Sequence, residues 1–125
     1  MRAEVVPYHA QVLLVGASRD GSVPEFVDGA EPVVATSAGI AVGARSDFVA
    51  GKGAVPVMVE VWSSQGPSGL VEIWRGEIAV GERGIAVGSL IGSDLHELQV
   101  RPGQHRVAVL VSPDQAPDHV AFVID

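Results

Sequence analysis

The segment AVPVMVEVWSS, residues 54–64, alternates valine with other residues more regularly than any other part of the chain. Successive side chains of a β-strand point to opposite faces, so alternate residues share a face. The side chains that we expect on the core face are Val55, Val57, Val59 and Val61. Met58, Glu60 and Trp62 then lie on the opposite face. The segment therefore predicts a strand with one buried face, as in an all-β fold.

The rest of the chain repeats this pattern in shorter pieces. Runs of β-branched residues are separated by turn residues, among them many of the 15 Gly and 8 Pro. Short strands at close spacing are typical of sandwiches and barrels. We find no convincing helix and prefer a strand even for GSDLHELQV, residues 92–100. We predict an all-β, antiparallel two-sheet sandwich of eight or nine strands with jelly-roll or Greek-key connections; a closed barrel is the alternative.

Length and composition indicate one domain, residues 1–125. Hydrophobic residues make up 47% of the 125 residues and charged residues 18%, which is too apolar for a disordered chain. There is no cysteine, so disulfides are excluded. No apolar run approaches the ~20 residues of a spanning helix. We interpret the N-terminal MRAEVVPYHAQVLLVG as the first strand and not as a signal peptide. We expect a cytoplasmic protein that does not bind membranes.

The charge balance bears on the partner. The formal net charge is −7 and the sequence pI is about 4.9. An acidic domain repels phosphate backbones, whereas nucleic-acid binding usually needs a basic patch. We therefore expect a protein partner or self-association, and no nucleic acid.

The pentapeptide GIAVG occurs twice, at residues 39–43 and 84–88. After each copy come a Val-alternating strand, a break rich in Ser, Gln and Pro, and another strand. One interpretation is a duplication that contributes one similar succession of strands to each half of the sandwich. The other is that two sheets use similar residues. In both cases we expect Ile and Val of each copy to point to the core.

Motifs for catalysis or metal binding are not found in the sequence. The four histidines, His9, His96, His105 and His119, show no HxH or HExxH spacing. A nucleophile elbow of the form GxSxG and a phosphate-binding loop are also missing. We expect no metal, no cofactor and no enzymatic activity.

One pair of acids requires a separate hypothesis. If QGPSG, residues 65–69, closes a hairpin, then Glu60 lies opposite Glu72, and two like charges destabilise a sheet unless a cation relieves them. Arg75 or Arg106 is the expected cation. Paired acids beside Trp side chains would suit a sugar-cleaving enzyme. The alternative, which we prefer, is that these residues form the outer, solvated face of a sandwich.

We predict that this outer face is an interaction surface, because Trp, Met and Arg are enriched at protein interfaces. A long polar loop over residues 16–32 adds acidic side chains. The alternative is that one or both Trp residues cap the core. The predicted surface comprises Met58, Glu60, Trp62, Glu72, Trp74 and Arg75, together with Asp20, Glu25 and Asp28 of the loop.

The C-terminal half resembles a type of small bacterial all-β protein with a remote likeness to the competence-nuclease inhibitor. The resemblance lies in GEIAVGERGIAVGS, residues 76–89, and LQVRPGQHRVAVLVSPDQAPDHVAFVID, residues 98–125. His105 replaces the usual aromatic residue, and an aromatic-Pro ending is missing. The resemblance implies a binding or inhibitory protein. The matching residues are Trp74, in the strand that leads to these segments, and Glu77, Pro102, Gly103, His105, Arg106, Val107 and Val109 within them.

The sequence thus supports three hypotheses of function. The first is a non-enzymatic protein-interaction module, such as an acidic inhibitor or immunity-type protein for a basic partner. The second is a sandwich that binds a small ligand or carbohydrate. The third is a self-assembling structural subunit.

Overall fold

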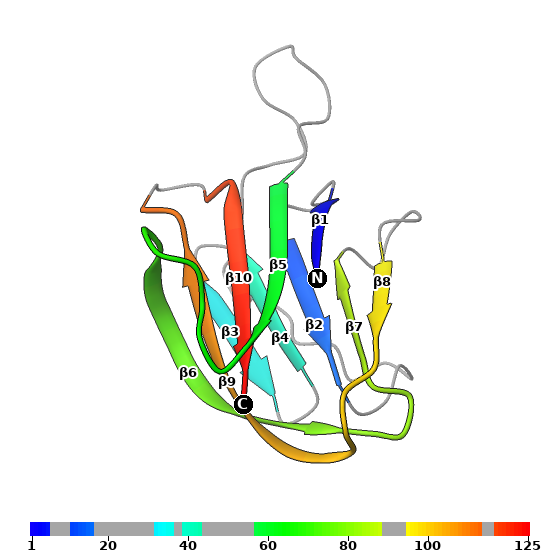
Figure 1. The fold of residues 1–125 in the computed structure, drawn as a ribbon. Helices are drawn as coiled ribbons and strands as arrows, with labels where there is room; N and C mark the ends of the chain where they lie inside the picture. The colour runs from blue at the N-terminus through cyan, green and yellow to red at the C-terminus, as the bar shows by residue number, and fades with distance from the viewer. Residues whose placement is uncertain (6–10, 17–31, 37–38, 44–56, 89–94, 114–116) are drawn as a thin grey trace.

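The computed structural model describes residues 1–5, 11–16, 32–36, 39–43, 57–88, 95–113 and 117–125. These residues form ten strands and no helix (Figure 1), so no helix long and apolar enough to cross a membrane occurs among them. The strands are β1 (Arg2–Val5), β2 (Gln11–Val15), β3 (Val33–Thr36), β4 (Gly39–Gly43), β5 (Val57–Ser63), β6 (Val71–Val80), β7 (Ile85–Gly88), β8 (Leu95–Leu98), β9 (Gly103–Val111) and β10 (His119–Ile124). The all-β prediction is confirmed.

Ten strands exceed the eight or nine predicted because two segments each hold two strands. The N-terminal segment, interpreted as one strand, contains both β1 and β2. The stretch after Pro32 contains both β3 and β4, which pair with each other in an antiparallel hairpin. Residues 92–94 lie outside the described part, but β8 confirms a strand in the LHEL portion of GSDLHELQV.

The strands form two five-stranded sheets that pack against each other (Figure 1). The first sheet has the order β1-β5-β10-β9-β6, and the second has the order β3-β4-β2-β7-β8. The pairings between these strands are antiparallel except that β5 and β10 run parallel. The two-sheet sandwich is therefore confirmed, with one parallel pair inside the first sheet.

The core lies between the two sheets and is built by alternating side chains. Val57 and Val59 are fully buried and Val61 is 9% exposed, as their alternation predicts, while Val55 lies outside the described residues. β9 and β10 follow the same rule, and Phe122 of β10 is the largest fully buried side chain among the described residues. Burial of one such side chain contributes about 1.5–3 kcal/mol. The alternation along β5 therefore identified the correct core face.

The QGPSG segment does not close a hairpin. β5 pairs with β1 on one side and β10 on the other, while β6 pairs with β9. Two strands, β10 and β9, therefore separate β5 from β6. The connection crosses the outer face of these strands, because a Cβ added at Gly66 would come within 2.8 Å of Val123 and 3.2 Å of Leu110. The hairpin prediction is wrong because both edges of β5 are occupied by strands remote in sequence.

The two GIAVG copies lie in the same sheet, on either side of β2. The first copy is β4, and the second forms β7 and the residue before it; both pair with β2 in antiparallel fashion. Ile40 and Ile85 are fully buried core residues, as predicted. The proposed arrangement of one copy in each half of the sandwich is wrong, because both copies flank one central strand.

Candidate functional site

Trp62 is the large aromatic side chain that the described structure leaves exposed. It lies near the end of β5 on the face opposite the core, and 41% of its surface is exposed. Met58 is half-buried on the same face. Exposed large apolar side chains of this kind are enriched at interfaces. The predicted outward orientation of Trp62 is therefore confirmed.

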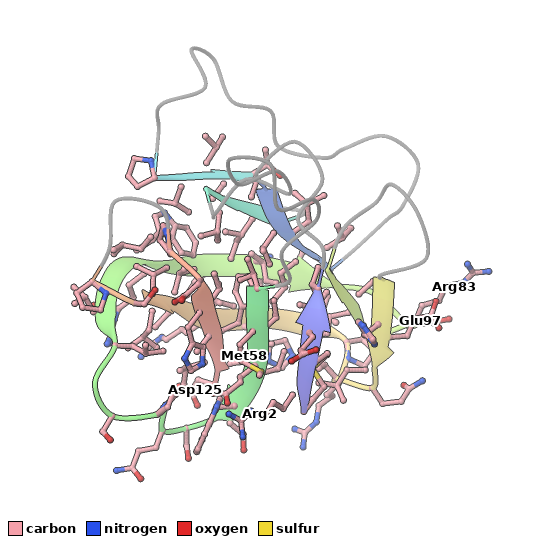
Figure 2. The ribbon with its side chains drawn as sticks, turned by 90° about the horizontal axis from the view of Figure 1, so that it is seen from above. Arg2, Met58, Arg83, Glu97 and Asp125 are labelled. Carbon is pink, nitrogen blue, oxygen red and sulfur yellow. The ribbon has the colours of Figure 1, made fainter. Side chains whose placement is uncertain are left out.

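Glu60 lies between them on this face but is buried, with 6% of its surface exposed. The Trp62 Nε1–H donates a 2.9 Å hydrogen bond to Glu60 Oε2. Arg2, directly opposite Glu60 on β1, places its Nε 3.1 Å from Oε1. The same Arg2 Nε lies 3.3 Å from the Sδ of Met58, and Figure 2 shows the two side chains together. The acid is thus held by neighbours on its own strand and on β1.

His119 of β10 completes the cluster from the other side of β5. Its Nε2 lies 3.3 Å from Glu60 Oε2, yet this buried nitrogen makes no well-directed hydrogen bond. His119 is therefore an electrostatic neighbour of the carboxylate, which a protonated imidazole would attract. Three strands, β1, β5 and β10, converge on one carboxylate.

Opposing effects set the pKa of Glu60. Burial raises the pKa, because the charged form loses solvation. The hydrogen bond from Trp62, the neighbouring His119 and the charge of Arg2 lower it, and together they hold the pKa below its ordinary value. Glu60 therefore remains a carboxylate at neutral pH and accepts a charge-assisted hydrogen bond from the indole of Trp62.

Trp74 does not share this face. The register of β6 against β9 shifts between Glu72 and Trp74, so Glu72 lies opposite Leu110 and Trp74 lies opposite the core residue Val109. A β-bulge inserts one residue and reverses the alternation beyond it. Trp74 is partly buried and packs against the core. The prediction that Trp62 and Trp74 share a face is wrong, and the alternative of a core-capping Trp is confirmed for Trp74.

Glu72 and Arg75 form a separate, exposed ion pair. Arg75 Nη2 lies 2.6 Å from Glu72 Oε1 on β6, at the edge of the first sheet. The hydrogen bond and charge of Glu72 raise the pKa of Arg75. Such surface pairs contribute little to stability. The hypothesis of an acid pair made by Glu60 and Glu72 is wrong, because β10 and β9 lie between them, and the cation beside Glu60 is Arg2.

A strained turn follows Trp62 directly. Ser64 has φ 67°, and the Gln65 N–H donates a 2.8 Å hydrogen bond to the Ser63 carbonyl. A bond from residue i to i+2 around a residue with positive φ is a γ-turn, which is rare and strained. Such strain is concentrated at functional sites. The turn ends β5 immediately after the exposed indole.

Two open hollows flank Trp62. The first, about 440 Å³, we call the Arg2 hollow. The second, about 310 Å³, we call the Leu98 hollow, and it lies where the ends of β5 and β10 meet the chain after β8. The described residues that line the Arg2 hollow are Met1, Arg2, Glu60, Val61, Trp62 and Ser63. Those of the Leu98 hollow are Val61, Trp62, Ser63, Leu98, Gln99, Val100, His105, Ile124 and Asp125.

His105 fixes one wall of the Leu98 hollow. Its Nδ1 lies 2.9 Å from the main-chain oxygen of Asp125, and its Nε2 lies 2.6 Å from that of Arg101. Both ring nitrogens therefore face main-chain oxygens, one from the residue after β10 and one from a residue before β9. The ring therefore ties the start of β9 to the end of β10.

Several predicted groups give no site in the described structure. Asp20, Glu25 and Asp28 lie outside the described residues. No group of three or more His, Asp or Glu side chains within the described ranges is placed to hold a metal ion.

Sequence reasoning missed Arg2, His119 and Asp125. Each lies on a strand, or at a strand end, that reaches β5 or Trp62 only through long-range pairing. Serine is common in turns but does not by itself indicate a positive φ, so the γ-turn at Ser64 was not predicted. The sequence signal was Glu60 in the middle of a valine-rich strand, two residues before Trp62. A buried acid predicts a cation nearby but does not identify the cation.

Comparisons with known proteins identify the fold. No family model matches the chain, and no curated protein matches it either. The solved structure of ComJ from Bacillus subtilis, an inhibitor of the DNA-degrading activity of NucA, is similar with a TM-score of 0.71. The match covers 99% of this chain and 93% of that chain at 15% identity. The chain therefore has the fold of a known nuclease inhibitor.

The structural match also corrects the extent of the likeness. The sequence resemblance covered about half the chain, whereas the similarity of fold covers nearly all of it. The remote likeness to the competence-nuclease inhibitor is supported at the level of the fold.

Proposed function

We propose that this protein is a non-enzymatic interaction module of the inhibitor type, which binds a basic protein partner through the surface around Trp62. The observation that carries the proposal is an exposed indole whose Nε1–H is held by a buried carboxylate. A fixed aromatic side chain loses little conformational entropy when a partner covers it, so it contributes strongly to affinity.

Fold and charge support the same proposal. ComJ, whose fold this chain shares, inhibits a nuclease, and nucleases must attract DNA with basic surfaces. A net charge of −7 would steer an acidic inhibitor toward such a partner. A nuclease is therefore the first class of partner to test. The acidic residues Asp20, Glu25 and Asp28 are proposed to add to this attraction.

The site residues divide accordingly. Trp62 is the proposed anchor, Glu60 and Arg2 are positioning residues, and Met58 extends the apolar area. Glu72 and Arg75 lie on β6, which two strands separate from β5, and are proposed to contribute only at the rim. Trp74 packs against the core, and we propose no binding role for it.

Capture of partners from a native extract tests the proposal. The wild type, Trp62→Ala and the control Val71→Ala are used as bait over a series of salt concentrations. Val71 is a matched control because it is 48% exposed but lies on β6 at the edge of the sheet. We expect one protein to be retained by the wild type and Val71→Ala, lost with Trp62→Ala, and released as salt rises.

The captured protein is then assayed for degradation of linear DNA with and without the wild-type chain. Slower degradation with the wild type, and not with Trp62→Ala, supports an inhibitor. If no protein distinguishes wild type from Trp62→Ala at any salt concentration, the proposal is wrong.

A small-ligand site is the second candidate, and the Leu98 hollow favours it. Its volume of about 310 Å³ is at the lower end of small-molecule pockets, which are about 300–1,000 Å³. A thermal-shift screen with sugars and small organic ions tests this alternative.

A further inference from the structure

The indole of Trp62 separates two hollows with different chemistry. The Arg2 hollow has a guanidinium in its wall, which also neutralises Glu60. The described lining of the Leu98 hollow has no Lys or Arg and includes Asp125 beside apolar residues. The two sides of Trp62 would therefore select different groups from a partner.

Asp125 supplies an unneutralised charge. It is exposed at the end of β10 (Figure 2), and no hydrogen bond or ion pair to its carboxylate is found in the described structure. The other polar side chain of note in this hollow is His105, whose two ring nitrogens face main-chain oxygens. Both ring nitrogens of His105 are therefore directed at main-chain oxygens, and neither is directed at the side-chain carboxylate of Asp125.

The hydrogen bond to Glu60 favours binding of a cation to the ring of Trp62. Its only N–H donates to Glu60, so a partner meets the ring face or edge and finds no free donor. Donation to an anion also increases the electron density of the ring, which strengthens its attraction for a cation above the face. Leu98, Val100 and Ile124 offer apolar contact for the stem of a long cationic side chain.

We propose that the Leu98 hollow receives an arginine side chain of the protein partner. The stem packs on Leu98, Val100 and Ile124, and the guanidinium lies between the Trp62 face and the Asp125 carboxylate. Arginine fits better than lysine because its planar guanidinium both stacks on an aromatic ring and pairs with a carboxylate. The proposal rests on the proposed function and names the part of the partner that Trp62 binds.

Short peptides test the hollow without the partner. The probes are acetyl-Gly-X-Gly-amide, where X is arginine, citrulline, lysine or norleucine. Citrulline keeps the shape of arginine without its charge, and norleucine tests an apolar occupant. Binding is followed through the indole N–H resonance of Trp62, assigned with Trp74→Phe. We expect saturable shifts for the arginine peptide with a dissociation constant on the order of 1–10 mM.

Two charge variants give the decisive comparison. Asp125→Asn should weaken binding of the arginine peptide by about threefold to tenfold. Glu77→Gln removes the same charge from an exposed site on β6 and should leave binding unchanged. The lysine peptide should bind several-fold more weakly than the arginine peptide.

Four results would overturn the proposal. They are equal binding of the citrulline or norleucine peptide, equal effects of Asp125→Asn and Glu77→Gln, the absence of any shift at Trp62, and self-association that covers Trp62 at the concentrations used. Partner capture separates this proposal from the proposed function. A partner lost with Trp62→Ala but fully retained by Asp125→Asn would overturn the arginine site alone.

Discussion

Trp62 and Glu60 lie two residues apart on the outer face of β5, and the Nε1–H of the first donates to the Oε2 of the second at 2.9 Å. A buried acid therefore determines how an exposed aromatic ring is presented. The carboxylate itself is kept in place by Arg2 from the neighbouring strand. Any change at Glu60 should consequently affect both the stability of the sheet and the orientation of the ring.

Removing the charge of Glu60 tests this link. Glu60→Gln keeps an acceptor for the indole but loses the attraction for Arg2, so we expect the free energy of unfolding to fall by about 1–2 kcal/mol. The control Glu72→Gln breaks an exposed pair and should cost less than about 0.5 kcal/mol. Urea unfolding measures both, and equal costs would contradict the structure.

The pH dependence of stability should report the same carboxylate. Because its pKa is lower in the folded state than the ordinary 4.5, Glu60 stabilises the fold fully above that pH. The contribution is lost as the pH falls below 4.5 and through the folded pKa. Urea unfolding at a series of pH values should show a steeper acid decline for the wild type than for Glu60→Gln. Parallel curves would contradict a lowered pKa.

The two Trp residues should behave differently on truncation. Trp62→Ala removes an exposed ring and should lower the free energy of unfolding by less than about 1 kcal/mol, whereas Trp74→Ala opens the edge of the core and should cost about 3 kcal/mol. Thermal unfolding of the two variants under identical conditions makes the comparison. A larger loss for Trp62→Ala would mean that its role is structural.

Gly76 is needed because Trp74 lies over it. A Cβ at Gly76 would come within 2.5 Å of the Cζ2 and Cη2 atoms of the indole. We expect Gly76→Ala to cost about 1–3 kcal/mol through overpacking. Trp74→Phe removes those two ring atoms, so the double variant should be more stable than the sum of the single effects predicts. Strict additivity in a double-mutant cycle would show that the ring does not lie there.

Alanine substitutions at three glycines distinguish the cost of a steric clash from the cost of an unfavourable φ. An added Cβ at Gly39 would meet the Leu14 carbonyl at 2.7 Å, whereas Gly69 has φ +87° and open space around it. Gly84 combines φ +76° with a close approach to the Leu98 carbonyl. We expect Gly84→Ala to cost more than about 2 kcal/mol and more than either other alanine variant. Urea unfolding of the three variants checks the order.

The sequence predicted those features that depend on neighbours along the chain. The alternating valines of β5 identified its core face and placed Trp62 on the outside, because side-chain direction in a strand has a period of two. The same reasoning failed on β6, where the bulge before Trp74 reverses the period. Neither Glu72 nor Trp74 is a residue type that marks a bulge, so nothing local predicted it.

Strand order could not be predicted, and the site depended on it. A short Gly- and Pro-containing segment between two strands usually closes a hairpin, which is why Glu72 was expected opposite Glu60. Pairing of β5 with β1 and β10 brought Arg2 and His119 to Glu60 instead. Such pairings depend on the packing of the whole sheet and leave no signature in either segment.

The parallel pairing of β5 with β10 has a consequence for biosynthesis. β10 joins the β1–β5 pair to the β9–β6 pair, so the first sheet is incomplete until it emerges from the ribosome. Val59 is translated well before its partner Val120. At a synthesis rate of about 5–20 residues per second, β5 remains without β10 for several seconds. During that interval a valine-rich strand edge lies open to other chains. Nascent chains of this protein should therefore depend on ribosome-associated chaperones and fold only after β10 has been made.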